Sequence, residues 1–170
     1  MRMPQALLVT VFVFVALAGI QACSSNKDKE SVSIGSIIIA DKPPRLDITI
    51  QTSNNLNPDR VGRPSPIVVR LYELKVDTAF NNANFFALYD SDKDILGDDL
   101  VKVEEMEVAP GKTITLARKK FDMESKMLGV LAAYRNLDNA KWRATVKTPI
   151  NRKSKITIRL EELAVVVEKN

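Results

Sequence analysis

The sequence predicts an all-β fold, a two-sheet β-sandwich of about eight strands with one small helical insertion. The first observation is a series of short segments that are apolar on one face or on both. The second is that Pro, Gly, Asn and Asp mark turns between these segments. The third is that a helical pattern appears in one stretch only, near residues 78–100. No repeat or second domain boundary appears, so we expect one domain over residues 36–170.

The strands are expected in order from residue 45 onward. Leu46, Ile48 and Ile50 alternate with polar residues, which indicates a strand buried on one face. Two segments are apolar on both faces and are expected inside a sheet, residues 66–74 and 128–135. The remaining strands are expected within residues 101–108, 113–117, 142–148, 155–160 and 163–168.

The segment at residues 101–108 changes the phase of its apolar side chains. Val101 and Val103 share one phase, whereas Met106 and Val108 share the other. This change predicts a β-bulge at residues 104–105.

The helical insertion is expected to begin at Asp77 or Thr78, either of which is a suitable N-cap, and to run through Tyr89. Its apolar side chains are expected to pack the helix onto the domain: Phe80, Phe85, Phe86 and Leu88. An acidic turn at residues 90–94 and a second helical turn near residues 95–100 should follow. The acidic turn starts like a calcium loop, but Ile95 and Val101 stand where that loop needs glycine and glutamate.

The first 22 residues have the layout of an export signal. Arg2 precedes a run at residues 6–18 in which Thr10 is the single polar residue, and this run is shorter than the ~20 residues of a membrane-spanning helix. Residues 1–22 are therefore predicted to be a signal peptide that is removed. The polar residues 23–35 are predicted to form a flexible tether.

The end of this segment, Ile20-Gln21-Ala22-Cys23, resembles a bacterial lipobox. The resemblance implies that Cys23 becomes the new N-terminus and carries three acyl chains, which hold the protein on a membrane. Ser24 rather than aspartate follows the cysteine, and in bacterial lipoproteins this implies export to the outer membrane. The alternative is an ordinary secretory signal before an unmodified Cys23, an unusual unpaired thiol in an oxidising compartment.

The residue types present exclude most catalytic chemistry. The chain has no histidine and one cysteine, which excludes His-based triads and, with Cys23 acylated, thiol nucleophiles. The remaining enzymatic option is a carboxylate pair that acts on cell-wall glycan, either Glu104 with Glu107 or Asp98 with Asp99. We expect a binding protein with no catalytic residue, no cofactor and no metal site.

The charge of the chain is too small to predict a nucleic-acid partner, since the formal net charge is +4 at pH 7. Basic residues cluster at 118–120 and at 152–155. Both clusters are expected at solvated turns between strands.

The connection at residues 53–66 is the strongest candidate for a binding site. It is far longer than the two to five residues of an ordinary hairpin. Its three prolines and one glycine restrict its conformations, which reduces the entropy lost on docking. The alternative is a variable surface loop without a partner.

Several segments, taken together, resemble one family, the outer-membrane lipoproteins of the type VI secretion system called TssJ or SciN. The most specific is the run Arg-Pro-Ser-Pro-Ile-Val-Val-Arg-Leu-Tyr-Glu-Leu at residues 63–74. The others are Asn57-Pro58-Asp59, the aromatic segment at residues 80–89, Gly97-Asp98-Asp99, Pro110-Gly111, and residues 128–143.

The resemblance implies a transthyretin-like sandwich on the inner leaflet of the outer membrane, facing the periplasm. It also implies a protein partner, the periplasmic C-terminal region of TssM, in a multi-copy membrane complex. The contact would fall on residues 54–65. The expected contact residues are Leu56, Asn57, Asp59, Arg60, Val61 and Arg63, with Pro58, Gly62 and Pro64 shaping the loop. The alternative function is a transthyretin-like lipoprotein that binds a small ligand or a cell-wall fragment.

Overall fold

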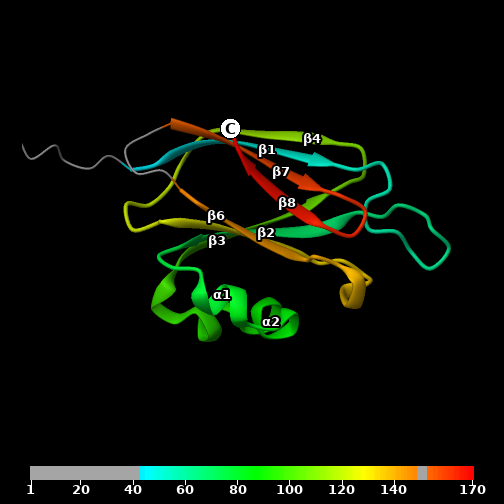
Figure 1. Cartoon of the computed structure of the whole chain (residues 1–170), viewed down its shortest axis with the longest axis horizontal. Coiled ribbons are helices and arrows are strands. Elements are labelled where there is room, and N and C mark those ends of the chain that lie inside the picture. The colour runs from blue at the N-terminus through cyan, green and yellow to red at the C-terminus, as the bar shows by residue number, and fades with distance from the viewer. Residues whose placement is uncertain (1–42, 149–152) are drawn as a thin grey trace, which may run out of the picture. The chain divides into compact units, whose positions relative to one another are not determined.

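The computed structural model describes residues 43–148 and 153–170, which form two β-sheets of four strands each (Figure 1). One sheet has the order β4-β1-β7-β8 and the other the order β3-β2-β5-β6. The predicted β-sandwich of about eight strands is therefore confirmed. The strands are β1 Arg45–Thr52, β2 Ile67–Leu74, β3 Leu100–Val108, β4 Thr113–Lys120, β5 Met127–Ala132, β6 Arg143–Lys147, β7 Lys153–Leu160 and β8 Val165–Lys169.

The predictions for the signal peptide, Cys23 and the tether lie outside the described residues. Within the described residues, no helix is long and apolar enough to cross a membrane.

The hydrophobic core lies between the two sheets. Leu46, Ile48 and Ile50 of β1 are fully buried, as their alternation predicts. β7 runs parallel to β1 and adds its own alternating residues to the same inner face, namely Ile156, Ile158 and Leu160. β2 and β5, predicted to lie inside a sheet, are the two central strands of theirs.

The predicted bulge at residues 104–105 is wrong. β3 pairs with β2 in continuous register from Val108 to Lys102, and the irregularity lies near Leu100 instead. Val103 packs with the helical insertion, whereas Met106 and Val108 pack in the core between the sheets. The apolar phase changes along β3 because the two faces of this strand have different apolar neighbours.

The helical insertion covers the outer face of the β3-β2-β5-β6 sheet (Figure 1). It consists of two helices, α1 Thr78–Asn82 and α2 Phe85–Leu96, followed by a 3-10 turn at Gly97–Asp99. The prediction of one helix through Tyr89 is therefore wrong. The helix is interrupted between Asn82 and Phe85. The side chain of Asn84 accepts a hydrogen bond from the Ala87 N–H at 2.9 Å and caps α2.

The predicted acidic turn at residues 90–94 lies inside α2, which is kinked at Ser91. Phe80 and Leu88 are buried as expected, but Phe86 is 65% exposed. Two arginines of the sheet hold the insertion in place. Arg143 of β6 donates hydrogen bonds to the carbonyl oxygens of Phe80, at 2.8 Å, and Ala83.

On another strand of the same sheet, Arg70 of β2 donates to the carbonyl oxygen of Tyr89 at 2.7 Å, and its guanidinium lies 4.3 Å from the centre of the Tyr89 ring. Arg70 also pairs with Glu105 of β3 at 2.6 Å. The insertion is therefore fixed to the sheet by cation contacts as well as by apolar packing.

β1 runs from one end of the sandwich to the other (Figure 1). We call the end that contains Arg45 the proximal end, and the end that contains Thr52 the loop end. Since a strand rises about 3.3 Å per residue, the two ends of β1 are roughly 25 Å apart. The β1–β2 loop at residues 53–66 leaves from the loop end, together with the β3–β4, β5–β6 and β7–β8 connections.

The β4–β5 connection, residues 121–126, closes the proximal end and is tied down by one buried carboxylate. Glu73 of β2 is 4% exposed and accepts hydrogen bonds from the Asp122 N–H at 2.9 Å and the Ser125 hydroxyl at 2.8 Å. These bonds satisfy two donors that the connection cannot satisfy by itself.

Replacing Glu73 with leucine keeps the approximate size of the side chain but leaves both donors without an acceptor. We expect Glu73→Leu to lower the free energy of unfolding by about 1–3 kcal/mol. The matched control is Glu107→Leu on β3, where the side chain is exposed, and its effect should stay within about 0.5 kcal/mol. Urea denaturation measures both values. Equal losses for the two variants would contradict the role given to Glu73.

Candidate functional site

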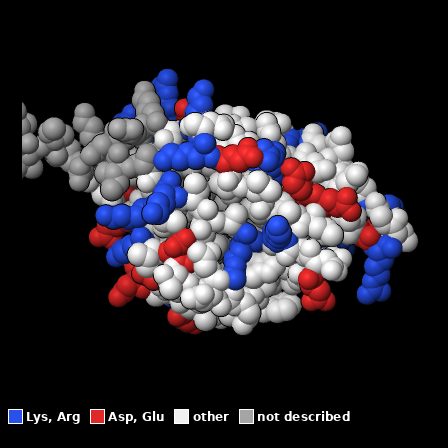
Figure 2. Space-filling view, viewed as in Figure 1, with Lys and Arg blue, Asp and Glu red and all other residues white. Residues whose placement is uncertain are grey.

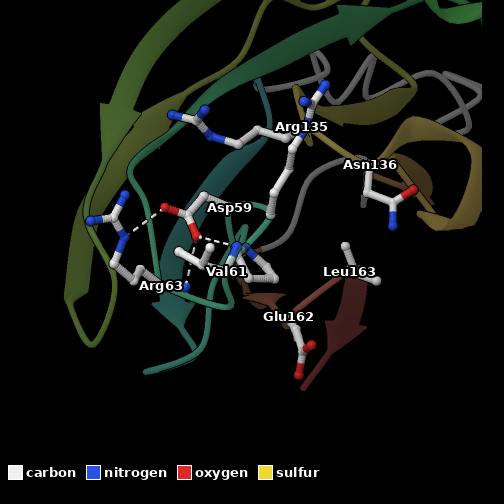
Figure 3. Close-up of a pocket in the computed structure, with 9 residues that line it drawn as sticks. Asp59, Val61, Arg63, Arg135, Asn136, Glu162 and Leu163 are labelled. Carbon is white, nitrogen blue, oxygen red and sulfur yellow. Dashed lines mark hydrogen bonds and ion pairs between the residues drawn. The ribbon is translucent and has the colours of Figure 1, made fainter.

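Three connections surround a groove at the loop end (Figure 3). They are the β1–β2 loop, the β5–β6 connection at residues 133–142 and the β7–β8 connection at residues 161–164. The groove has a volume of about 850 Å³ and is open to solvent. It is lined by Pro58, Asp59, Arg60, Val61, Arg63, Arg135, Asn136, Glu162 and Leu163.

The base of the β1–β2 loop is fixed by a buried leucine. Leu56 is 0% exposed and belongs to the core between the sheets. Its carbonyl oxygen accepts a hydrogen bond from the Ser65 N–H at 3.0 Å, which joins the two arms of the loop. The buried Leu56 side chain therefore makes the base of the loop part of the hydrophobic core.

Asn57 joins the loop to both neighbouring connections. Its backbone N–H donates to the carbonyl oxygen of Glu162 at 3.1 Å, and its Nδ2 donates to that of Pro66 at 2.9 Å. Its Oδ1 accepts a hydrogen bond from the Arg135 N–H at 2.8 Å. The residue is 2% exposed and has a φ of 48°, a left-handed conformation that asparagine tolerates better than most residues.

Leu56 and Asn57 were expected to contact a partner directly, and the structure places both side chains inside the domain. The physical reason is that a long loop between two sheets needs internal contacts to hold a shape. Any part that these two residues play in binding would come from shaping the loop.

The tip of the loop is closed by Asp59. Its Oδ1 accepts hydrogen bonds from the backbone N–H groups of Val61, at 2.9 Å, and Arg63, at 3.0 Å. Its Oδ2 pairs with the Arg63 guanidinium at 2.8 Å. The Asp59 carbonyl oxygen accepts the Gly62 N–H at 3.0 Å, and Gly62 has a φ of 83°, which favours glycine.

The Arg63 N–H and the Arg63 guanidinium, together with the Val61 N–H, lower the pKa of the Asp59 carboxyl below its usual value. The folded pKa is depressed, so the contribution of these bonds is fully present above the ordinary pKa of aspartate. It is lost as the pH falls through the lower folded value. At neutral pH the ring of bonds around Asp59 is therefore complete.

The side chains that the tip presents to solvent are cationic and apolar. Val61 is 75% exposed, and the Arg63 side chain is 79% exposed. Arg60, Gly62 and Pro64 are also exposed, while Pro58 and Asp59 are half-buried. Seven of the nine predicted loop residues therefore lie at or near the surface, and Figure 3 shows Asp59, Val61 and Arg63 on one side of the groove.

Sequence reasoning missed the other side of the groove, which is formed by Arg135, Asn136, Glu162 and Leu163 (Figure 3). Arg135 and Asn136 follow Tyr134, the last buried residue after β5, and both are exposed. The sequence does change there from an apolar run to Arg135 and Asn136, and this change indicates the start of a connection. No sequence pattern shows that this connection lies against the β1–β2 loop.

Glu104, one of the carboxylates considered for glycan hydrolysis, is paired with two lysines. Glu104 pairs with Lys102 at 2.7 Å and with Lys119. Both lysines lower the pKa of the Glu104 carboxyl, whereas a general acid needs a raised pKa. In the described ranges, no group of three His, Cys, Asp or Glu side chains is placed to hold a metal ion.

The hydrogen bonds of Asn57 can be tested separately from its backbone conformation. Glycine favours a positive φ, so Asn57→Gly keeps the backbone relaxed and removes only the two side-chain bonds. We expect a loss of about 1–3 kcal/mol in the free energy of unfolding and faster amide exchange at Arg135. Asn55→Gly, in the exposed part of the same loop, is the control and should leave the exchange at Arg135 unchanged. Unchanged exchange in both variants would show that Asn57 does not join the loops.

Comparison with protein families and solved structures identifies relatives of this chain. A family model described as type VI secretion lipoprotein (VasD, EvfM, TssJ) matches residues 44–163. A comparison with curated protein sequences finds no match.

The crystal structure of the T6SS lipoprotein TssJ1 from Pseudomonas aeruginosa is similar, with 39% identity and a TM-score of 0.73. The match covers 76% of this chain and 98% of that one. Lip of Serratia marcescens, a membrane-bound component of the type VI secretion system, has 23% identity and a TM-score of 0.66, over 76% and 99% of the two chains.

A chain in a structure described as the T6SS protein TssM C-terminal domain from EAEC has 20% identity and a TM-score of 0.61, over 74% and 98% of the two chains. At this identity, the likeness of Lip and of the EAEC chain shows the fold alone. The family model, which spans most of the described domain, and the TssJ1 structure agree on one assignment. This chain belongs to the type VI secretion lipoprotein family, TssJ.

Proposed function

We propose that this protein links the outer membrane to the periplasmic C-terminal region of TssM. Cys23 carries the lipid anchor at one end, and the β1–β2 loop binds the partner at the other. The observation that carries the proposal is the tip of that loop, which is exposed and held in one shape by Leu56, Asn57 and Asp59.

A preorganised loop favours binding because little conformational entropy is lost when the partner docks. The base of the loop is bonded to two neighbouring connections, and its tip is closed by the bonds to Asp59. These contacts leave Arg60, Val61 and Arg63 projecting from a fixed support. An exposed apolar side chain beside arginines is the composition of an interface centre.

The neighbouring connection extends the proposed contact surface. Arg135 and Asn136 line the same groove as the tip. Within the described residues, neither Arg60 nor Arg135 forms an ion pair, so both cations are open to carboxylates of a partner. We therefore add Arg135 and Asn136 to the contact residues expected from the sequence.

The length of the domain suits a mechanical link. The loop end lies roughly 25 Å along β1 from Arg45, where the described domain begins to form strands. A partner at the loop end and a lipid anchor before the proximal end would load the sandwich along its strands. No turnover is required for this role.

Val61 provides a sharp test of the contact. Val61→Asp places a charge where we propose an apolar contact, and we expect it to weaken binding to the periplasmic region of TssM at least about tenfold. Val76→Asp is the matched control, because Val76 is 48% exposed at the proximal end. Isothermal titration calorimetry measures both affinities, and thermal melting checks that both variants fold. Equal affinities for Val61→Asp and the unmodified protein would exclude the tip as the binding site.

The anchor is tested with Cys23→Ser in the full chain. The variant lacks the thiol that the lipid would modify, so we expect a folded domain that still binds TssM in calorimetry. It should leave the membrane fraction, and type VI secretion should be lost. A single acyl chain gives only marginal membrane binding, and this variant would carry none of the three. We therefore expect its membrane association to be lost completely. Normal secretion by cells that carry Cys23→Ser would contradict anchoring as the function.

A further inference from the structure

Four exposed cations gather near the proximal end of the β4-β1-β7-β8 sheet, and we call them the basic cluster. They are Arg45 on β1, Arg118 and Lys120 on β4, and Lys155 on β7. Arg45 and Lys120 are direct cross-strand partners. Figure 2 shows basic side chains at the left of the view, with acidic side chains nearby, where these strands have their proximal ends in Figure 1.

The basic cluster contains four cations and one carboxylate, Asp47, which is the register partner of Lys155. Within the described residues, none of its four cations forms an ion pair. Asp47 is the acidic residue among them, and its Oδ1 accepts the Arg118 backbone N–H at 2.7 Å. Arg45 and Lys120 place two like charges directly opposite each other, an arrangement that is unfavourable in a sheet.

Two other cations on the same sheet, Arg159 and Lys119, form ion pairs. Arg159 of β7 makes two hydrogen bonds to the carboxylate of Glu168 on β8, one of them at 2.6 Å. Lys119, next to Lys120, pairs with Glu104 of the other sheet.

The surface between these cations carries hydroxyl groups. A shallow depression contains Arg118 and Lys155 of the cluster and three threonines, Thr49, Thr115 and Thr157. Its lining also includes Asp47, Ala117, Ile156 and Asn170, so two cations there face one carboxylate. Cationic side chains and hydroxyl donors together are the groups that bind phosphate oxygens.

We propose that the basic cluster contacts the phosphodiester headgroups of anionic phospholipids in the membrane that holds Cys23. The inference rests on the proposed lipid anchor and goes beyond it, because it assigns an orientation to the domain. The proximal end would lie on the membrane surface, and the loop end would point away from it toward the partner.

The sequence limits how far the cluster can be from the membrane. Pro43 follows Cys23 by 20 residues, and a fully extended chain of that length spans at most about 70 Å. A tether in this range keeps the cluster at an effective concentration on the order of millimolar near the headgroups. Each Lys or Arg near an anionic surface then favours the docked state by roughly fivefold.

The test uses the full lipidated chain in vesicles. Thr115→Cys places a fluorescent label in the depression, and Val61→Cys places the same label at the loop end. With Cys23 acylated, the introduced cysteine is the single reactive thiol of the chain. The readout is quenching of the label by headgroup-quencher lipids, in vesicles of equimolar phosphatidylglycerol and phosphatidylcholine or of phosphatidylcholine alone.

We expect strong quenching at Thr115 in the anionic vesicles and weak quenching at Val61. The Thr115 signal should fall in phosphatidylcholine vesicles and at about 1 M salt, where the Debye length is ~3 Å. The double variant Lys120→Glu/Lys155→Glu removes two cations and adds two anions, so docking should fall by at least roughly 25-fold. The control Lys93→Glu/Lys141→Glu makes the same change in net charge at exposed sites outside the cluster and should keep the signal.

Flotation of the same vesicles separates this inference from the anchor. Protein that fails to float, or that takes a second label at Cys23, would overturn the anchor. Protein that floats but shows equal quenching at Thr115 in both lipid compositions would overturn the basic cluster and leave the anchor intact. A signal lost equally in both double variants would also overturn it, because net charge alone would then explain docking.

Discussion

The hydrogen bonds of Asn57 are the contacts on which the loop end depends. The β1–β2 loop crosses from one sheet to the other, and a loop of its length loses much conformational entropy if it holds one shape. Asn57 offsets that loss by bonding to the β5–β6 and β7–β8 connections at once, through Arg135 and Glu162. Leu56 adds a buried side chain at the same point. The groove exists because these three connections are held together.

The features that follow from periodicity were predictable from the sequence. The alternation of Leu46, Ile48 and Ile50 predicted the inner face of β1. Apolar residues on both faces predicted that β2 and β5 are central strands. The break before Asn84 was missed, although asparagine is a common N-cap, because Asp77 offered an earlier one. The phase change along β3 was misinterpreted because periodicity does not show which apolar layer lies on each face.

The candidate site was predictable in part for a different reason. The length and the prolines of the β1–β2 loop identified it, but a single leucine in a polar loop has no periodicity that predicts its burial. The pairing of Asn57 with Arg135 joins residues 78 positions apart, and local sequence carries no signal for it. Tertiary packing thus divides the predicted contact residues into two that support the loop and a larger group at its surface.

The proposed link uses the two opposite ends of the domain. The proximal end holds cations that form no ion pair within the described residues, and the loop end holds a shaped tip, with the strands of the core between them. The proposed binding of TssM requires a loop end that is rigid before the partner arrives. Backbone ¹⁵N relaxation of the free protein tests this requirement most directly. The account predicts order parameters near about 0.85 for residues 57–63, like those of the strands, whereas values below about 0.6 would show a flexible loop and contradict it.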